Sequence, residues 1–476
     1  MILAGAEKAQ ARRRLGMAPQ AAHSPQPGAQ PGTDTLPQIK HIVILMMENH
    51  SYDNYFGMLT DHGDGFSLGP DGKPVGSNAD SDGKHVPLTH SAKTTQHAHV
   101  PTQTWHASHI QWNNGAADGF VRGIEQTMPD EDATAAMLYW TESELPFYYG
   151  LARTFPLATR WFGSCLGPTF PNRRFLIAGT AHGLIDDLPF DMIDYPENGT
   201  ILDHLTAHGI SWVNYHHLSR IRINWQRIGH AKGLQFFRLL GGAVAGLYPQ
   251  FRARLESKLV VTADMYPLGY LRALNHIRPI DDFWHAASAG TLPSVTFVDP
   301  DFPANSEENP QDIQIGEEFA ARVINAVMNG KGWPHTLLVW LYDEHGGYYD
   351  HVPPPAAPAP DDVPAMSPYQ RYPALKLLSR TSLGRKVTAA DSGPQTYTQL
   401  GFRVPAVVVS PYAKPGYVSE VVYDHTAILK LIERKWSLPP LTRRDAAAAD
   451  MLEMLDLESP PAFLDPPVLP KPARAG

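Results

Sequence analysis

Residues 40–57 read KHIVILMMENHSYDNYFG, and this stretch sets the expectation for the fold. Residues 42–47 are apolar throughout, which is typical of a strand buried on both faces of a parallel sheet. Glu48 and Asn49 follow this strand directly. Ligands of open α/β sheets bind outside the carboxyl ends of the strands, so an acid and an amide at this point favour a functional site. The alternative is a strand that simply ends in a polar turn.

The rest of the chain alternates short apolar strands with helical patterns. The other predicted strands are residues 210–215, 295–298, 336–341 and 404–409. Residues 316–330, GEEFAARVINAVMNG, have apolar residues near helical spacing, and DHTAILKLIERKWSL begins with Asp424 in an N-cap position. This alternation predicts an α/β fold with a mostly parallel central sheet covered on both faces.

Length and composition limit the classes of function. A chain of 476 residues with 43% hydrophobic content can bury a large core. A formal net charge of -9 argues against a nucleic-acid partner, so an anionic substrate must be held by local groups. Cys165 is the single cysteine, which excludes an internal disulfide and a cysteine-based structural zinc site. We expect it to be a buried thiol.

The flanking and inserted segments differ in composition from the body of the chain. Residues 1–38 have the composition of a disordered tail, residues 39–458 are expected to form one catalytic domain, and residues 459–476 form a Pro-rich tail. No signal peptide and no stretch of about 18 apolar residues is evident. Residues 218–266 contain GLQFFRLLGGAVAGLYPQF, which is either a lid that contacts lipid or a part of the core.

A hydroxyl precedes a predicted helix in the stretch GPTFPNRR, residues 167–174. Thr169 stands where free backbone N–H groups and the helix dipole favour a phosphate. Asn172 and Arg173 follow within one turn. The simpler interpretation is that Thr169 is only an N-cap, and this motif alone does not decide between the two.

The stretch LLVWLYDEHGGYYDHVPPP, residues 337–355, is more informative. Asp343 and Glu344 leave a buried strand side by side, His345 follows, and two glycines allow a tight turn. Adjacent carboxylates are costly to bury unless a positive charge lies between them, and a metal ion meets that need. A solvated acidic turn is the alternative.

Five blocks together resemble the phosphoesterase family that contains non-specific phospholipases C and a group of acid phosphatases. They are MMENHSYDNYFG, GPTFPNRR, DEHGGYYDHVPPP, GFRVPAVVVSPYA and YDHTAILKLIE, and they span roughly residues 40–436 in the family's order. The resemblance implies an alkaline-phosphatase-like three-layer α/β sandwich with a single metal site and a hydroxyl nucleophile. Independently of the resemblance, residues 401–433 have the pattern of a strand and loop that run into a helix, which makes His425 a first-turn helix residue rather than a ligand.

The resemblance assigns roles to individual positions. Glu48, Asn49, Asp343 and Glu344 match the metal ligands, and Thr169 matches the nucleophile and completes the metal site. Oxygen ligands of this kind suit Ca, Mg or Mn better than zinc, which usually binds His or Cys. A metal can favour the alkoxide of a threonine hydroxyl while it neutralises charge on a phosphoryl group.

At the remaining predicted site positions, the residue types match those of the family less closely. The catalytic set is completed by Asn172, Arg173 and His345, and the substrate-binding set is Asn49, His106, His109 and Asn309. Asn309 stands where many relatives have a histidine in Asp-His-Pro, and Gln103, Thr104 and Trp105 stand where many have His-Ser-Trp. His106, His109 and His345 are the nearest substitutes by position, and a structural role for each is an equal alternative.

These residues predict a metal-dependent phosphoric ester hydrolase of the phospholipase C type with a phospho-threonine intermediate. The alternatives are an acid phosphatase that acts on soluble monoesters and a weakened binding protein for phosphoryl ligands. The stretch GSCLG lacks the spacing of a GxSxG serine hydrolase. The expected partners are a phosphate ester and phospholipid at a membrane surface. Without a signal peptide the default location is cytoplasmic, although family members are often secreted.

Overall fold

The computed structural model describes residues 28–98, 100–187, 195–217, 261–266, 272–366 and 394–473. Its centre is an 8-stranded sheet in the order β12-β6-β11-β10-β1-β9-β7-β8. The bounds of these strands are β1 His41–Met47, β6 Leu157–Ala158, β7 Trp212–His216, β8 Ile277–Pro279, β9 Val295–Val298, β10 Thr336–Tyr342, β11 Ala406–Val409 and β12 Val418–Ser419.

Strand β1 lies at the centre of the sheet and pairs in parallel with both β9 and β10. Ile42 lies opposite Val295 on one side and Leu337 on the other. Strand β7 joins in parallel through β9, and β8 through β7, whereas β11 is antiparallel to β10. All residues of β9, β10 and β11 are buried. The predicted mostly parallel α/β sheet is therefore confirmed.

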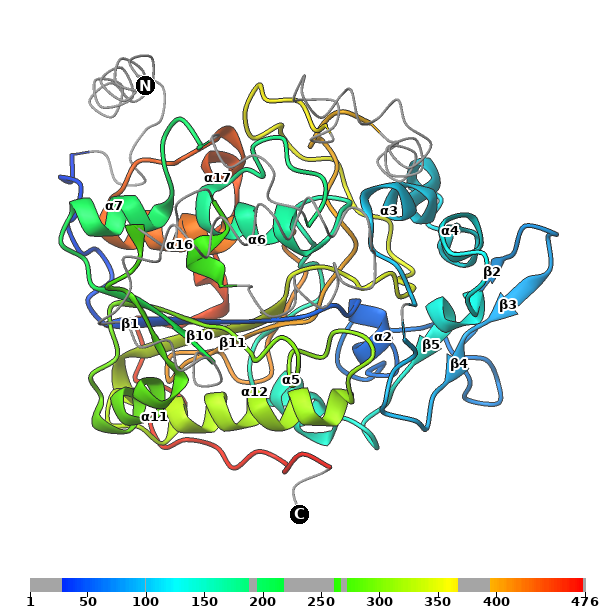
Figure 1. The fold of residues 1–476 in the computed structure, drawn as a ribbon. Helices are drawn as coiled ribbons and strands as arrows, with labels where there is room; N and C mark the ends of the chain where they lie inside the picture. Colours follow the sequence, from blue (N-terminus) through cyan, green and yellow to red (C-terminus); the bar gives the residue numbers. More distant parts are fainter. Residues whose placement is uncertain are drawn as a thin grey trace, which may run out of the picture.

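Helices cover both faces of this sheet, which makes three layers (Figure 1). One face carries α6 (Thr169–Ala178), α7 (Ile201–Ala207), α16 (Thr426–Trp436) and α17 (Arg443–Ala447). The other carries α5 (Pro146–Thr154), α11 (Ile280–Ala289) and α12 (Ile313–Met328).

A further group of elements lies beyond one end of the sheet (Figure 1). It contains α2 (Tyr52–Phe56), α3 (Trp105–Trp112), α4 (Phe120–Thr127), β2 (Ser77–Ala79), β3 (His85–Pro87), β4 (Thr89–His90) and β5 (Leu138–Tyr139). Short 3-10 turns occur at Asn113–Gly115, Ala133–Met137, Thr262–Asp264, Trp333–His335 and Leu452–Met454. Because α2 follows β1 directly, this group lies at the carboxyl end of the central strands.

Element ends differ from the sequence prediction by a few residues. Strand β11 begins at Ala406 rather than 404, because Pro405 has no N–H to give to the ladder. Helix α12 begins three residues before Gly316, at a point where the Asp312 carboxylate accepts a hydrogen bond from the N–H of Gln314. The backbone N-cap of α16 is His425 rather than Asp424.

Both ends of the described chain pack against the domain. Part of the tail predicted to be disordered is held in place, since the N–H of Thr35 donates to the carbonyl of Lys435 and Lys435 Nζ lies 2.6 Å from Asp34 Oδ1. Residues 459–473 contain no helix or strand, as their proline content predicts, and the Phe463 carbonyl accepts from Trp333 Nε1 at 2.8 Å.

Two other expectations concern apolar segments. The stretch at 233–251 predicted to be a lid or core lies outside the described residues. Within the residues that are described, no helix combines the length and the apolar character needed to cross a membrane.

Candidate active site

Two pairs of polar residues leave the sheet side by side. Strands β1 and β10 are parallel neighbours whose last residues lie opposite each other. Glu48 and Asn49 follow β1, Asp343 and Glu344 follow β10, and each of the four is at most 2% exposed. The structure thus brings together the four side chains that the sequence predicts as metal ligands on strand ends.

The amide of Asn49 lies between the two acids of the other strand. One end of the amide lies 3.1 Å from Asp343 Oδ1 and 2.9 Å from Glu344 Oε1, and the other end lies 3.2 Å from Gln103 Nε2. With its nitrogen toward the acids, the amide donates to both carboxylates and accepts from Gln103. With its oxygen toward them, three oxygens face one another, an arrangement that a cation between them would stabilise.

The side chains of Glu48, Asp343 and Glu344 form a carboxylate cluster, and Arg173 on α6 supplies a positive charge to it. Its Nε lies 3.0 Å from Asp343 Oδ2, and its Nη2 lies 3.3 Å from Glu48 Oε1. The same guanidinium donates to the carbonyls of Met46 and Met47 at the end of β1. One buried arginine thus joins the start of α6 to the ends of the two central strands.

A single arginine does not compensate for the burial of three acids. Burial and the charge of Asp343 raise the pKa of Glu48 well above its usual value, and Arg173 opposes this shift. Burial and the same aspartate also raise the pKa of Glu344. Burial raises the pKa of Asp343, while the neighbouring guanidinium lowers it. The cluster therefore favours binding of additional positive charge.

These oxygen donors fit a hard divalent cation. Glu48 Oε1 is buried, and although Arg173 Nη2 lies 3.3 Å away, it accepts no hydrogen bond from any described residue. A carboxylate oxygen left in this state is costly unless an ion binds it. Glu48, Asn49, Asp343 and Glu344 would hold such an ion, and none of them is a His or Cys of the kind that zinc prefers.

A second acidic group lies in the loop that follows β10. Ligand atoms of Asp53, Asp350 and His351 lie within 4.8 Å of one another, a spacing that could hold a metal. Arg403 already bonds both acids, with Nη2 2.9 Å from Asp53 Oδ1 and Nε 2.8 Å from Asp350 Oδ1. The carboxylates of this group thus have a cation within the chain, as Glu48 and Asp343 have in Arg173, and a metal site at the strand ends stays a prediction.

Thr169 is the first residue of α6 and is 6% exposed. The N-cap is Pro168, so Thr169 does not cap the helix through its own side chain. Its hydroxyl makes no hydrogen bond with any group in the described part of the chain. Arg173 follows it by four residues, so both lie on the helix face that meets the strand ends.

Asn172 and Asn309 both hold loops in this geometry. Asn172 Oδ1 accepts from the N–H of Cys165 at 3.1 Å, and its Nδ2 donates to the carbonyl of Gly167 at 2.8 Å. These bonds fix the turn that presents the α6 N-terminus. Asn309 Nδ2 donates to the Val100 carbonyl at 2.6 Å. Contact of either amide with substrate stays a prediction.

Of the four histidines near the predicted site, His345 and His425 are buried, and His106 and His109 are partly exposed. Burial lowers the pKa of His345 to about 3, and its Nε2 lies 2.7 Å from Gln111 Oε1. His425 is also buried, and its Nε2 hydrogen-bonds the Asp343 carbonyl at 2.6 Å. His106 and His109 are partly exposed on α3, where Nδ1 of His109 bonds a carbonyl of its own helix.

Three residues near the site carried no clear signal in the sequence. Gln103 faces the amide of Asn49, Gln111 orients His345, and Asp187 accepts a hydrogen bond from the N–H of Phe170 at 2.8 Å. Gln103 stands at a position where the sequence departs from its relatives, which was the one available hint. The other two lie far in sequence from the motifs that they support.

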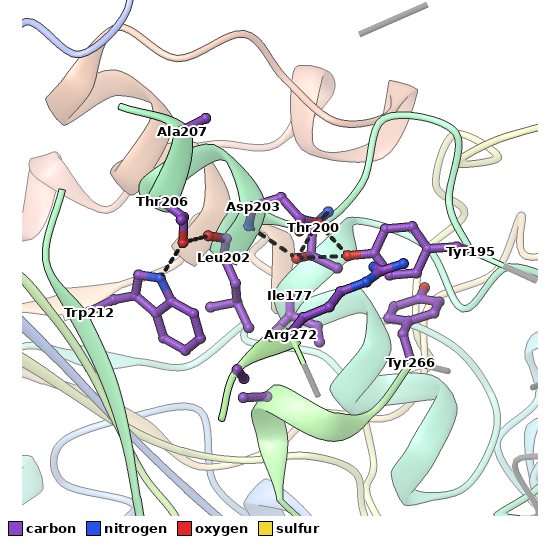
Figure 2. Close-up of a pocket in the computed structure, with 12 residues that line it drawn as sticks. Ile177, Tyr195, Thr200, Leu202, Asp203, Thr206, Ala207, Trp212, Tyr266 and Arg272 are labelled. Carbon is purple, nitrogen blue, oxygen red and sulfur yellow. Dashed lines mark hydrogen bonds between the residues drawn. The ribbon is translucent and has the colours of Figure 1, made fainter. Parts of the chain in front are cut away.

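A cavity of about 230 Å³ lies between α6, α7 and β7 (Figure 2). Its lining includes Tyr195, Trp212 and Tyr266, with the Arg272 guanidinium 3.5 Å from the Tyr195 ring centroid. None of the predicted site residues lines it. The cavity is therefore separate from the carboxylate cluster at the strand ends.

Comparison with known proteins gives a consistent result. A sequence model of the Phosphoesterase family matches residues 39–439. Phospholipase C A of Mycobacterium tuberculosis is 27% identical over 467 residues, which cover 91% of this chain and 80% of the relative. Non-specific phospholipase C6 of Arabidopsis thaliana is 27% identical over 466 residues, which cover 92% of this chain and 76% of the relative.

A further relative is considerably longer than this chain. Hemolytic phospholipase C of Pseudomonas aeruginosa is 28% identical over 454 residues. The matched region covers 90% of this chain but 57% of that relative. Residues 39–439, which the family model matches, contain the whole central sheet and the strand-end residues.

Proposed function

This chain belongs to the Phosphoesterase family, and on that premise we propose that it hydrolyses phosphoric diesters with Thr169 as the nucleophile. Glu48, Asn49, Asp343 and Glu344 would hold a divalent cation, which would supply positive charge to the reacting phosphoryl group. The relatives named as phospholipases C make a phospholipid headgroup ester the preferred substrate class. A soluble diester with the same phosphorus centre is expected to react as well.

One observation carries this proposal: the helix that begins with the Thr169 hydroxyl also supplies the arginine that pairs with buried acids at two strand ends. Arg173, which pairs with Glu48 and Asp343, lies one turn after Thr169 on α6. The hydroxyl is not engaged by other described groups, so it is available to a substrate. A phosphate bound here also meets free N–H groups at the start of α6.

The chemistry follows from these positions. The Thr169 oxygen attacks phosphorus and releases its proton to solvent, the bond from phosphorus to one alcohol of the diester breaks, and the resulting phospho-threonine still carries the other alcohol. Water then attacks the same phosphorus and releases Thr169. A bound divalent cation would favour the alkoxide and neutralise charge on the phosphoryl oxygens. The Arg173 guanidinium, which lies beside the carboxylates, adds a second positive charge that would stabilise the negative phosphoryl oxygens.

The leaving alcohol requires a proton, and His106 and His109 on α3 are the partly exposed histidines closest in sequence to Gln103. Burial lowers the pKa of His109 to about 4, so this ring is largely neutral at pH 7. His345 is buried and bonded to Gln111, which suits it to a positioning role. We therefore assign leaving-group protonation to His106.

An acid phosphatase that acts on soluble monoesters is the second candidate, since the same nucleophile and cation serve both reactions. An activity panel separates the two. It compares bis-p-nitrophenyl phosphate, p-nitrophenyl phosphate and phosphatidylcholine vesicles, each with and without chelator. The proposal expects chelator-sensitive hydrolysis of the two diesters. Hydrolysis of the monoester alone would favour the phosphatase, and phosphate binding without turnover would favour a binding protein.

A further inference from the structure

A carboxylate of the chain itself, that of Asp187, accepts a hydrogen bond from the first turn of α6. The backbone N–H of Phe170, the residue after Thr169, donates to Asp187 Oδ1 at 2.8 Å. Helix starts favour negative charge because their N–H groups are free and the helix dipole is positive there. α6 has 10 residues, so this effect is well developed. The Asp187 carboxylate thus occupies a position that a phosphoryl oxygen would otherwise favour.

The bonded N–H belongs to the residue that directly follows Thr169, so the Asp187 carboxylate lies close to the proposed nucleophile. A phosphoryl group that reaches Thr169 must approach this carboxylate.

We propose that Asp187 is a specificity-determining residue, which disfavours dianionic phosphomonoesters relative to monoanionic phosphodiesters at Thr169. This inference rests on the proposed function and refines its substrate class. A phosphodiester carries one negative charge, whereas a phosphomonoester carries close to two at pH 7. The second charge of a monoester is repelled by a carboxylate a few ångströms away in a largely buried site. A diester replaces that charge with an ester group and avoids the repulsion.

The test changes the charge of Asp187 and retains its acceptor. Asp187→Asn can still accept from the N–H of Phe170, so the helix start is kept. The ratio of kcat/KM for p-nitrophenyl phosphate to that for bis-p-nitrophenyl phosphate should rise about tenfold at pH 7.5. The inhibition constant of inorganic phosphate should fall by a similar factor. Asp187→Ser, with a shorter neutral acceptor, should shift the ratio in the same direction.

Asp362→Asn is the matched control, because the Asp362 side chain is 95% exposed and pairs with Arg443 at the surface. It should leave the ratio unchanged. An unchanged ratio in both Asp187 variants, with normal diester turnover, would show that Asp187 is only a helix cap and would overturn the inference.

Failure of the proposed function has a different signature. If the unmodified protein hydrolyses neither ester, calorimetric binding of inorganic phosphate still tests Asp187. Tighter binding by Asp187→Asn than by the unmodified protein would support the inference, and equal binding would reject it.

Discussion

Arg173 and Asp343 form an ion pair with both side chains fully buried and with Nε of the guanidinium 3.0 Å from Oδ2 of the carboxylate. The pair connects α6, which begins with Thr169, to the end of β10. Asp299 Oδ1 lies 3.9 Å from Nη1 of the same arginine. Since Asp299 directly follows β9, the end of this strand also contacts the guanidinium. The relative position of nucleophile and strand ends therefore depends on one guanidinium.

Replacement of this arginine should be strongly destabilising. Arg173→Met leaves Glu48 and Asp343 buried without their internal cation. We expect the free energy of unfolding to fall by about 3–5 kcal/mol in the presence of chelator, as when one partner of a buried pair is removed. Urea unfolding at pH 7 measures this change. Arg443→Met, at a largely exposed pair with Asp362, should cost about 1 kcal/mol or less. Equal losses in the two variants would contradict the role assigned to Arg173.

The nucleophile is tested by two substitutions at one position. Thr169→Ala should retain the fold and lose several orders of magnitude in kcat/KM, on the order of 10³-fold or more, because the covalent path is removed. Thr169→Ser should keep partial activity, since the hydroxyl survives. Turnover of bis-p-nitrophenyl phosphate by purified protein measures both, with thermal unfolding as a check on the fold. Near-normal turnover in Thr169→Ala would refute the covalent mechanism.

Divalent cations should stabilise the protein as well as activate it. A ligand that binds only the folded state raises Tm, so addition of Ca, Mg or Mn to chelated protein should increase it. Glu344→Gln should lose most of this increase together with the activity. Glu458→Gln, at an exposed position, is the control and should respond to metal like the unmodified protein. Zinc should restore less activity than the hard cations, and metal-independent hydrolysis by demonstrably metal-free protein would rule out the site.

A buried acid that contacts the last residue of β10 should make stability depend on pH. The Glu307 carboxylate accepts hydrogen bonds at 2.5 Å from the hydroxyls of Tyr55, Tyr148 and Tyr342. Burial raises the pKa of Glu307 from 4.5 to about 8, although these hydrogen bonds oppose the shift. The folded state therefore holds the proton more tightly than the unfolded state. Stability from this group is full below pH 4.5 and is lost as pH rises toward 8.

Glu307→Gln removes this titration. Between pH 5 and pH 8.5, the unfolding free energy of the unmodified protein should fall relative to that of the variant by on the order of 4 kcal/mol. Urea unfolding at the two pH values gives the comparison. A difference between the two proteins that stays constant with pH would show that Glu307 does not titrate in this range.

Local patterns in the sequence predicted the strands β1, β7, β9, β10 and β11, but not the short strands β6, β8 and β12 of the same sheet. The apolar residues 42–47 and 336–341 become β1 and β10, because a run without alternation is stable only when both faces are covered. The structure pairs these two strands in parallel, which places Glu48 and Asn49 beside Asp343 and Glu344. Short-range backbone geometry and burial determine these features, and both are visible in a single stretch of chain.

Tertiary packing decided which partner each polar side chain takes. The sequence shows Asn172 and Arg173 as equal members of one motif, yet the structure uses the first to hold the Cys165–Gly167 turn and the second to bond Asp343, 170 residues away. Asp187 reaches the start of α6 only because the chain returns there after the helix ends. Hydrogen bonds and ion pairs between distant residues form when packing brings buried polar groups together, and a buried group must take the partner that the fold places beside it.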